Sequence, residues 1–227
     1  MRKPFCSIIL PLYNQKDQLK TIINNYSRYL KKTRKTFEII LVINGPDDNS
    51  YNIAKKLTQN INYVSIYKLK TGGWGRAVRH GLKKSKGKYI CYTNSARTNI
   101  KDLLMLLKYA EVNDNAVIKA TRIIREDCFR KLGSVLYNFE TRLIFKIPIW
   151  DVNGTPKVIP RKILDKITLS SNGDLIDIEL LVKLFKLSIP IIEVPIKLTK
   201  RVSGRSTTNI ISAIKMYWGV FVLKNKI

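Results

Sequence analysis

Three polar turns that follow apolar runs carry side chains able to bind a nucleotide and its phosphates. They are PLYNQ at residues 11–15, INGPDD at 43–48 and TNSAR at 93–97. A glycine-rich stretch, GGWGR at 72–76, opens a segment with helical spacing. Backbone N–H groups and the dipole at a helix start favour phosphate. The stretch has neither the dinucleotide-binding fingerprint nor the P-loop spacing, so a tight turn that needs glycines explains it equally well.

The apolar pattern of the first half supplies a scaffold for these turns. Apolar runs predict strands at residues 6–14, 37–45, 61–69, 88–93 and 115–123. Helices are expected between them, at residues 19–30, 50–57, 74–87 and 102–110. This alternation predicts an α/β fold with a mainly parallel, Rossmann-like sheet flanked by helices. In such a sheet the ligand lies beyond the carboxyl ends of the strands, where the three polar turns follow.

The second half follows a different pattern. We expect a long helix at residues 128–147, a turn-rich hairpin or loop at 149–164 and a helix at 175–187. The strand expected at 189–198 contains two prolines, which places it at a sheet edge. A basic loop then leads to a last helix at 210–223. We assign residues 1–206 to one domain with a helical and edge-strand extension, and 207–227 to a C-terminal amphipathic helix.

Charge and cysteine content limit the partners and the compartment. The chain has 42 Lys and Arg against 16 Asp and Glu, a formal net charge of +26. This indicates anionic partners, namely nucleotide phosphates, lipid head groups or nucleic acid, although a generally lysine-rich surface explains part of the excess. Cys6, Cys91 and Cys128 show no paired spacing, and Cys6 and Cys91 are expected as buried thiols in a reducing compartment. We expect no signal peptide and no membrane span, hence a soluble or peripheral protein.

Taken in order, the segments resemble the family 2 glycosyltransferases, which use a nucleotide-sugar donor on a GT-A fold. The resemblance is greatest to the polyprenyl-phosphate (dolichyl-phosphate mannosyltransferase-like) branch. PLYNQ matches the family's P-x-Y-N-E except at Gln15. VINGPDD matches its V-D-D-G-S-x-D, with Ile43 and Asn44 in place of two acids. Counting on from Gly87, the family's D-x-D falls on Asn94, Ser95 and Ala96.

Later segments extend the resemblance to about residues 5–207. DVNGTPKVIPR at 151–161 is similar to the family's D-x-x-G-x-x-x-x-x-R segment. DIELL, followed by EVP, is similar to its acidic helix and the strand after it. RVSGRS at 201–206 carries an R-x-x-G-x-S pattern. Each motif is weak alone, and their order and spacing carry the specificity.

The resemblance implies a donor site at the strand ends. Asn44 would replace a carboxylate that holds the base or ribose, keeping hydrogen bonds but losing charge-assisted ones. Asp48 either belongs to this site or caps the helix after it. The residues implied in donor binding are Pro11, Tyr13, Asn14, Asn44, Gly45, Gly73, Arg76, Asn94 and Ser95.

The D-x-D position makes the family's divalent ion the least secure part of the resemblance. Magnesium and manganese prefer carboxylate oxygens, whereas Asn94 offers one weak ligand and the Ala96 side chain none. We therefore assign no metal. One hypothesis is that Arg97, together with Arg76, holds the leaving diphosphate instead. An unrecognised metal site and a non-catalytic descendant stay open as alternatives.

The resemblance also implies an acceptor site. Arg122, Arg130, Ser134, Arg201 and Ser206 would bind an acceptor phosphate. Asp151 would act as base for a hydroxyl acceptor or position the sugar, and the residues implied in catalysis are Arg97, Asp151 and Arg201.

The expected function is transfer of a sugar, with inversion, from a nucleotide-diphosphate donor to a polyprenyl phosphate or another membrane-linked acceptor. The expected location is the cytoplasmic face of an anionic membrane. The alternatives are a non-catalytic nucleotide-sugar-binding relative and a basic nucleic-acid-binding protein. Against the latter, no known nucleic-acid-binding motif is present.

Overall fold

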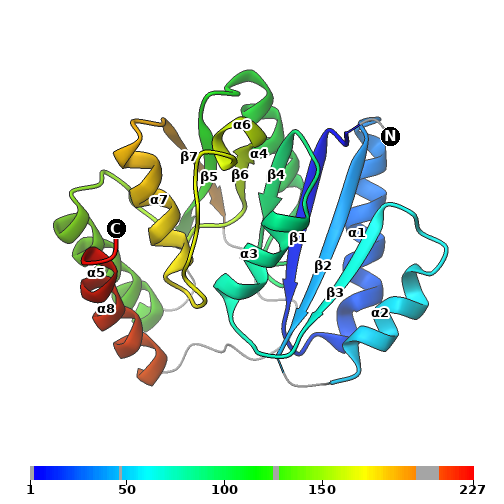
Figure 1. Cartoon of the computed structure of the whole chain (residues 1–227), viewed down its shortest axis with the longest axis horizontal. Helices are drawn as coiled ribbons and strands as arrows, with labels where there is room; N and C mark the ends of the chain where they lie inside the picture. Colours follow the sequence, from blue (N-terminus) through cyan, green and yellow to red (C-terminus); the bar gives the residue numbers. More distant parts are fainter. Residues whose placement is uncertain (1–2, 46–47, 125–127, 198–209) are drawn as a thin grey trace.

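A seven-stranded sheet forms the centre of the molecule (Figure 1). The computed structural model describes residues 3–45, 48–124, 128–197 and 210–227; of residues 124, 128–132 and 210–216 it describes only the strand or helix to which they belong. The strand order is β3-β2-β1-β4-β6-β5-β7, in which only β6 runs antiparallel to its neighbours. The strands are β1 Cys6–Leu12, β2 Phe37–Asn44, β3 Val64–Leu69, β4 Tyr89–Tyr92, β5 Val117–Ile124, β6 Lys157–Pro160 and β7 Ile191–Lys197.

Helices cover both faces of the sheet. The helices are α1 Leu19–Lys32, α2 Ser50–Thr58, α3 Trp74–Lys84, α4 Ile100–Val112, α5 Cys128–Phe145, α6 Arg161–Leu164, α7 Ile176–Lys186 and α8 Ile210–Lys224. Ile8 and Leu10 of β1 pack in one core with α1, α2 and α4, whereas Ile9 packs in a second core with α3 and α7. This alternation follows from the two-residue period of a strand. The predicted α/β architecture with a mainly parallel sheet is confirmed.

The prediction of a hairpin or loop at residues 149–164 is wrong in part, because this segment contains β6. β6 lies between β4 and β5 in the middle of the sheet. It has only four residues, begins with the buried Lys157 and ends at Pro160, so it lacks the apolar run that marks a central strand. The edge position expected for the proline-containing strand is confirmed, since among the described strands β7 pairs with β5 alone.

The expectations for the cysteines and for the start of the last helix also hold. Cys6 and Cys91 are buried free thiols, and burial, followed by the nearby Glu38 charge, raises the pKa of Cys6 to about 12. The last helix begins at Ile210, as predicted. Among the described residues, no helix combines the length and apolar character that crossing a bilayer requires.

Helix α3 lies directly on β1 because Gly81 has no side chain. A Cβ at Gly81 would stand 2.2 Å from Cγ2 of Ile9, in the middle of the sheet. The Gly81→Ala variant is therefore expected to lower the free energy of unfolding by about 1–3 kcal/mol through overpacking. Urea unfolding at neutral pH measures this loss.

Gly133→Ala is the matched control. A Cβ at Gly133, on α5, would meet no heavy atom within 4 Å. Replacing glycine by alanine within a helix there should raise the free energy of unfolding by about 0.5–1 kcal/mol. Equal effects of the two substitutions would contradict the packing of α3 on β1.

Candidate active site

The side chain of Asn44 links three segments at the carboxyl end of the sheet. Its Nδ2 donates to the Leu12 carbonyl oxygen at 3.0 Å, and its Oδ1 accepts from the Gly73 N–H at 3.1 Å. The side chain is buried. Because a carboxylate cannot donate a hydrogen bond, only an amide makes both contacts here. Asn44 therefore holds the glycine-rich loop against the ends of β1 and β2.

Tyr13 forms a flat aromatic surface beside this link. Gly45 has a φ of 115°, and a Cβ there would stand 2.4 Å from Cε2 of Tyr13, so the ring packs directly on the glycine. Gly72 approaches the same ring. Tyr13 remains 41% exposed, which leaves ring surface open to a planar ligand. Asn14, next in the chain, adopts a left-handed φ of 50°.

The glycine-rich loop packs against the segment that precedes α7. A Cβ at Gly73 would lie 2.6 Å from the Asn172 carbonyl oxygen, and one at Gly75 would lie 2.5 Å from that of Ser171. The Arg76 N–H donates to the Asn172 carbonyl at 2.9 Å. With Gly73 bound to Asn44, two N–H groups of this loop already have protein partners. The structure thus favours the tight-turn explanation over a phosphate cradle.

Glu179 anchors the segment that meets the glycine-rich loop. Its carboxylate accepts from the N–H groups of Ser170 at 2.8 Å and Ser171 at 2.7 Å, and from Nζ of Lys183 at 2.6 Å. Burial alone would raise the pKa of Glu179, but these hydrogen bonds outweigh it and lower the pKa from 4.5 to about 2. The ionised carboxylate therefore stabilises the folded loop.

Residues 94–97 form a turn closed by its own hydrogen bonds. Oδ1 of Asn94 accepts from the Ala96 N–H at 3.1 Å, and the Asn94 carbonyl accepts from the Arg97 N–H at 3.1 Å. Oγ of Ser95 donates to Oε1 of Gln15 at 3.1 Å. Gln15, which replaces an acid of the family's first motif, thus contacts the middle residue of the D-x-D position.

This turn does not fit a divalent ion. It contains no carboxylate, the Asn94 oxygen is engaged within the turn, and Ala96 is buried. Within the part of the chain that the structure describes, no group of three or more His, Cys, Asp or Glu side chains is arranged to hold a metal. Asp48, an acid of the turn after β2, accepts from N–H and Oγ of Ser50 at 3.1 and 2.7 Å. It therefore acts at the start of α2, in the capping role left open above.

On the other side of the sheet centre, Asp151 binds Arg122. Nε and Nη2 of Arg122 donate to the two carboxylate oxygens of Asp151 at 2.7 and 2.6 Å, and the Arg122 N–H donates at 3.0 Å. Asp151 is buried. A carboxylate that accepts three hydrogen bonds from one arginine is stabilised in its charged form, which makes it a poor general base. The arrangement suits the positioning role of Asp151 better than the role of base.

A buried network centred on Asp177 was missed by the sequence analysis. Asp177 accepts from Nε1 of Trp74 at 3.0 Å, from the Tyr92 hydroxyl at 2.8 Å and from Nζ of Lys157 at 2.5 Å. Nearby, Lys119 of β5 is fully buried and donates to Glu193 at 2.7 Å. Burial lowers the pKa of Lys157, although Asp177 opposes this effect. The sequence signal that could have revealed this network is a charged residue in an otherwise apolar segment, namely Lys119 in VIKAT, Lys157 in KVIP and Asp177 in IDIEL.

The remaining predicted residues are only partly described. Ser134 lies half-buried on α5. The Arg130 side chain, Arg201 and Ser206 lie outside the described residues, so their acceptor roles stay predictions. Pro11, in β1, is buried, and Arg76 donates from Nη1 to the Gly72 carbonyl at 2.9 Å. The donor-side residues thus gather around the ends of β1, β2 and β4, whereas on the acceptor side the structure places Arg122 on β5, Asp151 before β6 and Ser134 on α5.

Comparison with known proteins decides the family. A model described as glycosyl transferase family 2 matches residues 7–168. The chain belongs to the family 2 glycosyltransferases. A dolichyl-phosphate beta-glucosyltransferase of Saccharomyces cerevisiae is 25% identical over 257 residues, covering 97% of this family 2 chain and 74% of the yeast protein. An uncharacterized glycosyltransferase of Escherichia coli, YibD, is 27% identical over 138 residues, which are 60% of this chain and only 38% of that protein.

Solved structures agree on the fold. Glucosyl-3-phosphoglycerate synthase from Mycobacterium tuberculosis, in complex with Mn2+, UDP-glucose and phosphoglyceric acid, superposes with a TM-score of 0.77 at 14% identity. The match covers 99% of this chain and 80% of that one. A further mycobacterial protein reaches 0.75 at 17% identity. The GT-A fold predicted for this glycosyltransferase is therefore confirmed.

The low pKa of Glu179 predicts a specific acid response. Since the folded-state pKa of about 2 lies below the ordinary value of 4.5, the stabilisation is present above pH 4.5 and is lost as the pH falls towards 2. Glu179→Gln should lack this stabilisation at pH 7, being less stable by about 1–3 kcal/mol, and should lose less on acidification. Chemical unfolding across this pH range measures both effects.

Glu111→Gln provides the control, because Glu111 is largely exposed in its ion pair with Lys35. Its unfolding should follow the wild-type pH dependence closely. An unchanged acid response in Glu179→Gln would show that Glu179 does not anchor the loop.

Proposed function

We propose that this family 2 glycosyltransferase moves a sugar, with inversion, from a nucleotide-diphosphate donor to a polyprenyl phosphate at a membrane surface. Transfer from a nucleotide sugar follows from the family. The observation that carries the choice of acceptor is the alignment over 97% of this chain with a protein named as a dolichyl-phosphate beta-glucosyltransferase.

The ion pair between the partly buried Arg122 and the buried Asp151 fits a phosphate acceptor. In the transfer, a phosphate oxygen forms a bond to the anomeric carbon while the bond from that carbon to the nucleotide diphosphate breaks and the diphosphate leaves with the electron pair. The acceptor phosphate is already anionic, so it needs to be held in line rather than deprotonated. An Asp151 whose lone pairs bind Arg122 is compatible with this chemistry and unsuited to deprotonating a hydroxyl.

The leaving diphosphate needs positive charge to stabilise it. The turn at residues 94–97 has no carboxylate that could hold a metal ion for this purpose. Arg97 lies in this turn, with its backbone fixed by the hydrogen bond to Asn94. Arg76 is held over the glycine-rich loop by its bond to the Gly72 carbonyl. In our proposal these two guanidinium groups bind the diphosphate oxygens and stabilise the charge that develops on them.

Association with the cytoplasmic face of a membrane completes the proposal. A net charge of +26 favours a surface rich in anionic lipids. A lipid-linked acceptor would be presented at that same surface.

A transfer assay tests the function. The protein is incubated with labelled nucleotide sugars and a membrane lipid extract, with and without EDTA. We expect label in the lipid fraction at the same rate in both. Loss of transfer in EDTA would contradict the metal-independent part of the proposal. Nucleotide-sugar binding by calorimetry without product would indicate a binding-only relative, and binding of random DNA without nucleotide-sugar binding would overturn the proposal.

Arg97→Ala should lower kcat about 100-fold, because it removes a charge that, in our proposal, stabilises the leaving diphosphate. Arg97→Lys keeps the charge but loses the two-pronged contact, so its kcat should fall between those of Arg97→Ala and wild type. Arg28→Ala, which removes an exposed arginine over the Tyr29 ring on α1, is the control and should leave kcat unchanged. Full kcat in Arg97→Ala would rule out this role.

A further inference from the structure

Helix α5 exposes a stripe of large apolar side chains. Leu136, Phe139 and Leu143 are 52%, 61% and 63% exposed, and their spacing of three and four residues puts them on one face of the helix. The opposite face packs inward through the buried Tyr137 and Thr141. Exposed apolar side chains gathered on one helix face are characteristic of an interaction surface.

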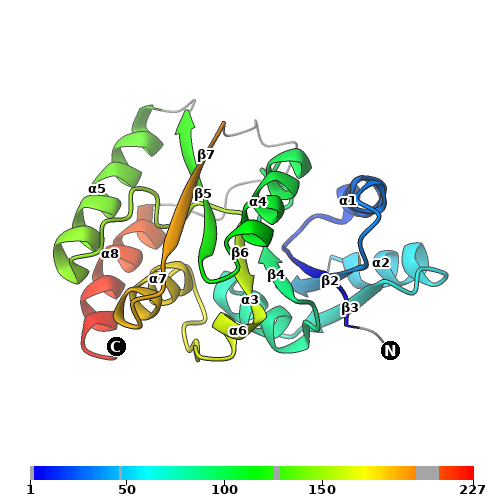
Figure 2. The same cartoon turned by 90° about the horizontal axis from the view of Figure 1, so that it is seen from above.

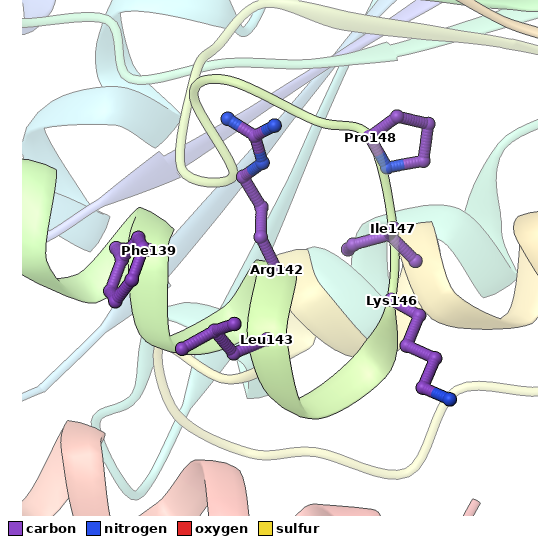
Figure 3. Close-up of a pocket in the computed structure, with 6 residues that line it drawn as sticks. All are labelled: Phe139, Arg142, Leu143, Lys146, Ile147 and Pro148. Carbon is purple, nitrogen blue, oxygen red and sulfur yellow. The ribbon is translucent and has the colours of Figure 1, made fainter.

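A groove with cationic walls adjoins this stripe. It has a volume of about 410 Å³ and is lined by Phe139, Arg142, Leu143, Lys146, Ile147 and Pro148 (Figure 3). None of these six side chains is acidic. Trp150 is 67% exposed, and the guanidinium carbon of Arg142 stands 4.1 Å from the centre of its ring. The groove therefore offers apolar contacts and positive charge together.

Helix α8 adds a second set of exposed apolar side chains at the same end of the molecule. Trp218, Phe221 and Val222 are 70%, 52% and 41% exposed. α8 packs on α5 through Tyr217, whose hydroxyl donates to the Gly133 carbonyl at 2.6 Å. Both helices lie at the end of the molecule opposite α1 and α2 (Figures 1 and 2). We call the exposed apolar residues of the two helices, with Trp150, Arg142 and Lys146, the α5–α8 surface.

We propose that the α5–α8 surface is where this protein binds a bilayer containing anionic lipids. Tryptophan, phenylalanine and leucine gain by leaving water, and aromatic and basic side chains together suit the boundary between head groups and acyl chains. Association with a second copy is opposed by repulsion between chains of charge +26, whereas an anionic bilayer complements that charge. The charge thus selects the lipid surface as the occupant.

The α5–α8 surface continues towards the predicted acceptor site. Trp150 directly precedes Asp151, whose carboxylate binds Arg122 at the end of β5. A lipid phosphate at the bilayer boundary would therefore stand near these residues. This inference rests on the proposed function for the identity of the acceptor, while binding to the bilayer stands on the surface alone.

Sedimentation with lipid vesicles tests the surface. The full chain is mixed with vesicles of phosphatidylcholine, with and without phosphatidylglycerol, and bound protein is measured. We expect binding that requires phosphatidylglycerol. The double variant Phe139→Ser with Leu143→Ser should bind at least about tenfold more weakly, because two large apolar contacts are lost. Lys146→Gln should weaken binding about fivefold.

Matched controls separate the surface from general hydrophobicity and charge. Tyr109→Ser with Val112→Ser removes two exposed apolar side chains from α4, and Lys55→Gln removes one exposed lysine from α2. Both should bind vesicles as wild type does. Equal binding by the α5 and α4 double variants, or no binding by wild type, would overturn the proposal. Light scattering without lipid measures self-association. If the wild type self-associates and the α5 double variant does not, the surface binds a second copy of the chain, and the proposal is overturned.

A water-soluble short-chain prenyl phosphate distinguishes this inference from the proposed function. The α5 double variant should transfer sugar to the short-chain acceptor at the wild-type rate and lose transfer only to the long-chain acceptor in vesicles. Vesicle binding by a wild type that uses neither acceptor would contradict the proposed function and leave the surface standing. Equal loss of both transfers in the double variant would contradict the separate role of the surface.

Discussion

The carboxylate of Asp177 is the contact on which the arrangement of the site depends. It lies at the start of α7 and binds side chains from α3, β4 and β6 at once, namely those of Trp74, Tyr92 and Lys157. Lys157 is fully buried, and an ammonium group without a partner at such a depth would cost several kcal/mol, about 3–5 in measured cases. The pair therefore fixes where a short antiparallel strand can lie in an otherwise parallel sheet. Since Asp151 precedes that strand by six residues, its place beside Arg122 of β5 follows from the same contact.

Two further ion pairs, each with one partly exposed partner, lie on the same side of the sheet centre. Lys119 pairs with Glu193 across β5 and β7, and Arg122 pairs with Asp151. In each pair a cation that would otherwise be costly to bury meets one carboxylate with close geometry. The acceptor side of a strongly basic protein is thus built on locally balanced charge.

The sequence predicted the elements of the first half because their apolar runs and helical spacing are long and regular. It did not predict β6, because four residues bounded by a lysine and a proline give no periodic signal. The positions of Tyr13, Asn44 and Gly45 at the strand ends could be anticipated from the order of the motifs. The double hydrogen bond of Asn44 and the network of Asp177 could not, since both join residues that lie far apart in the chain. The two glycines of the loop at residues 72–76 were visible, yet what they approach, the carbonyls of Ser171 and Asn172, depends on tertiary packing.

The missing acids of the donor side acquire a physical explanation from these contacts. Where the family places carboxylates, Asn44 uses its amide to join Leu12 to Gly73, and Asn94 closes its own turn while Ser95 binds Gln15. At each of these positions a negative charge, which a cation would have to neutralise, is absent. In its place stands a neutral side chain whose hydrogen bonds are made within the protein. Restoring a single acid at Asn44 would therefore break the bond to Leu12 without creating a metal site. The donor loops and the acceptor side are joined through Asp177, because Trp74 follows Gly73 directly and Lys157 leads back to Asp151. A site organised in this way keeps its geometry through hydrogen bonds within the protein.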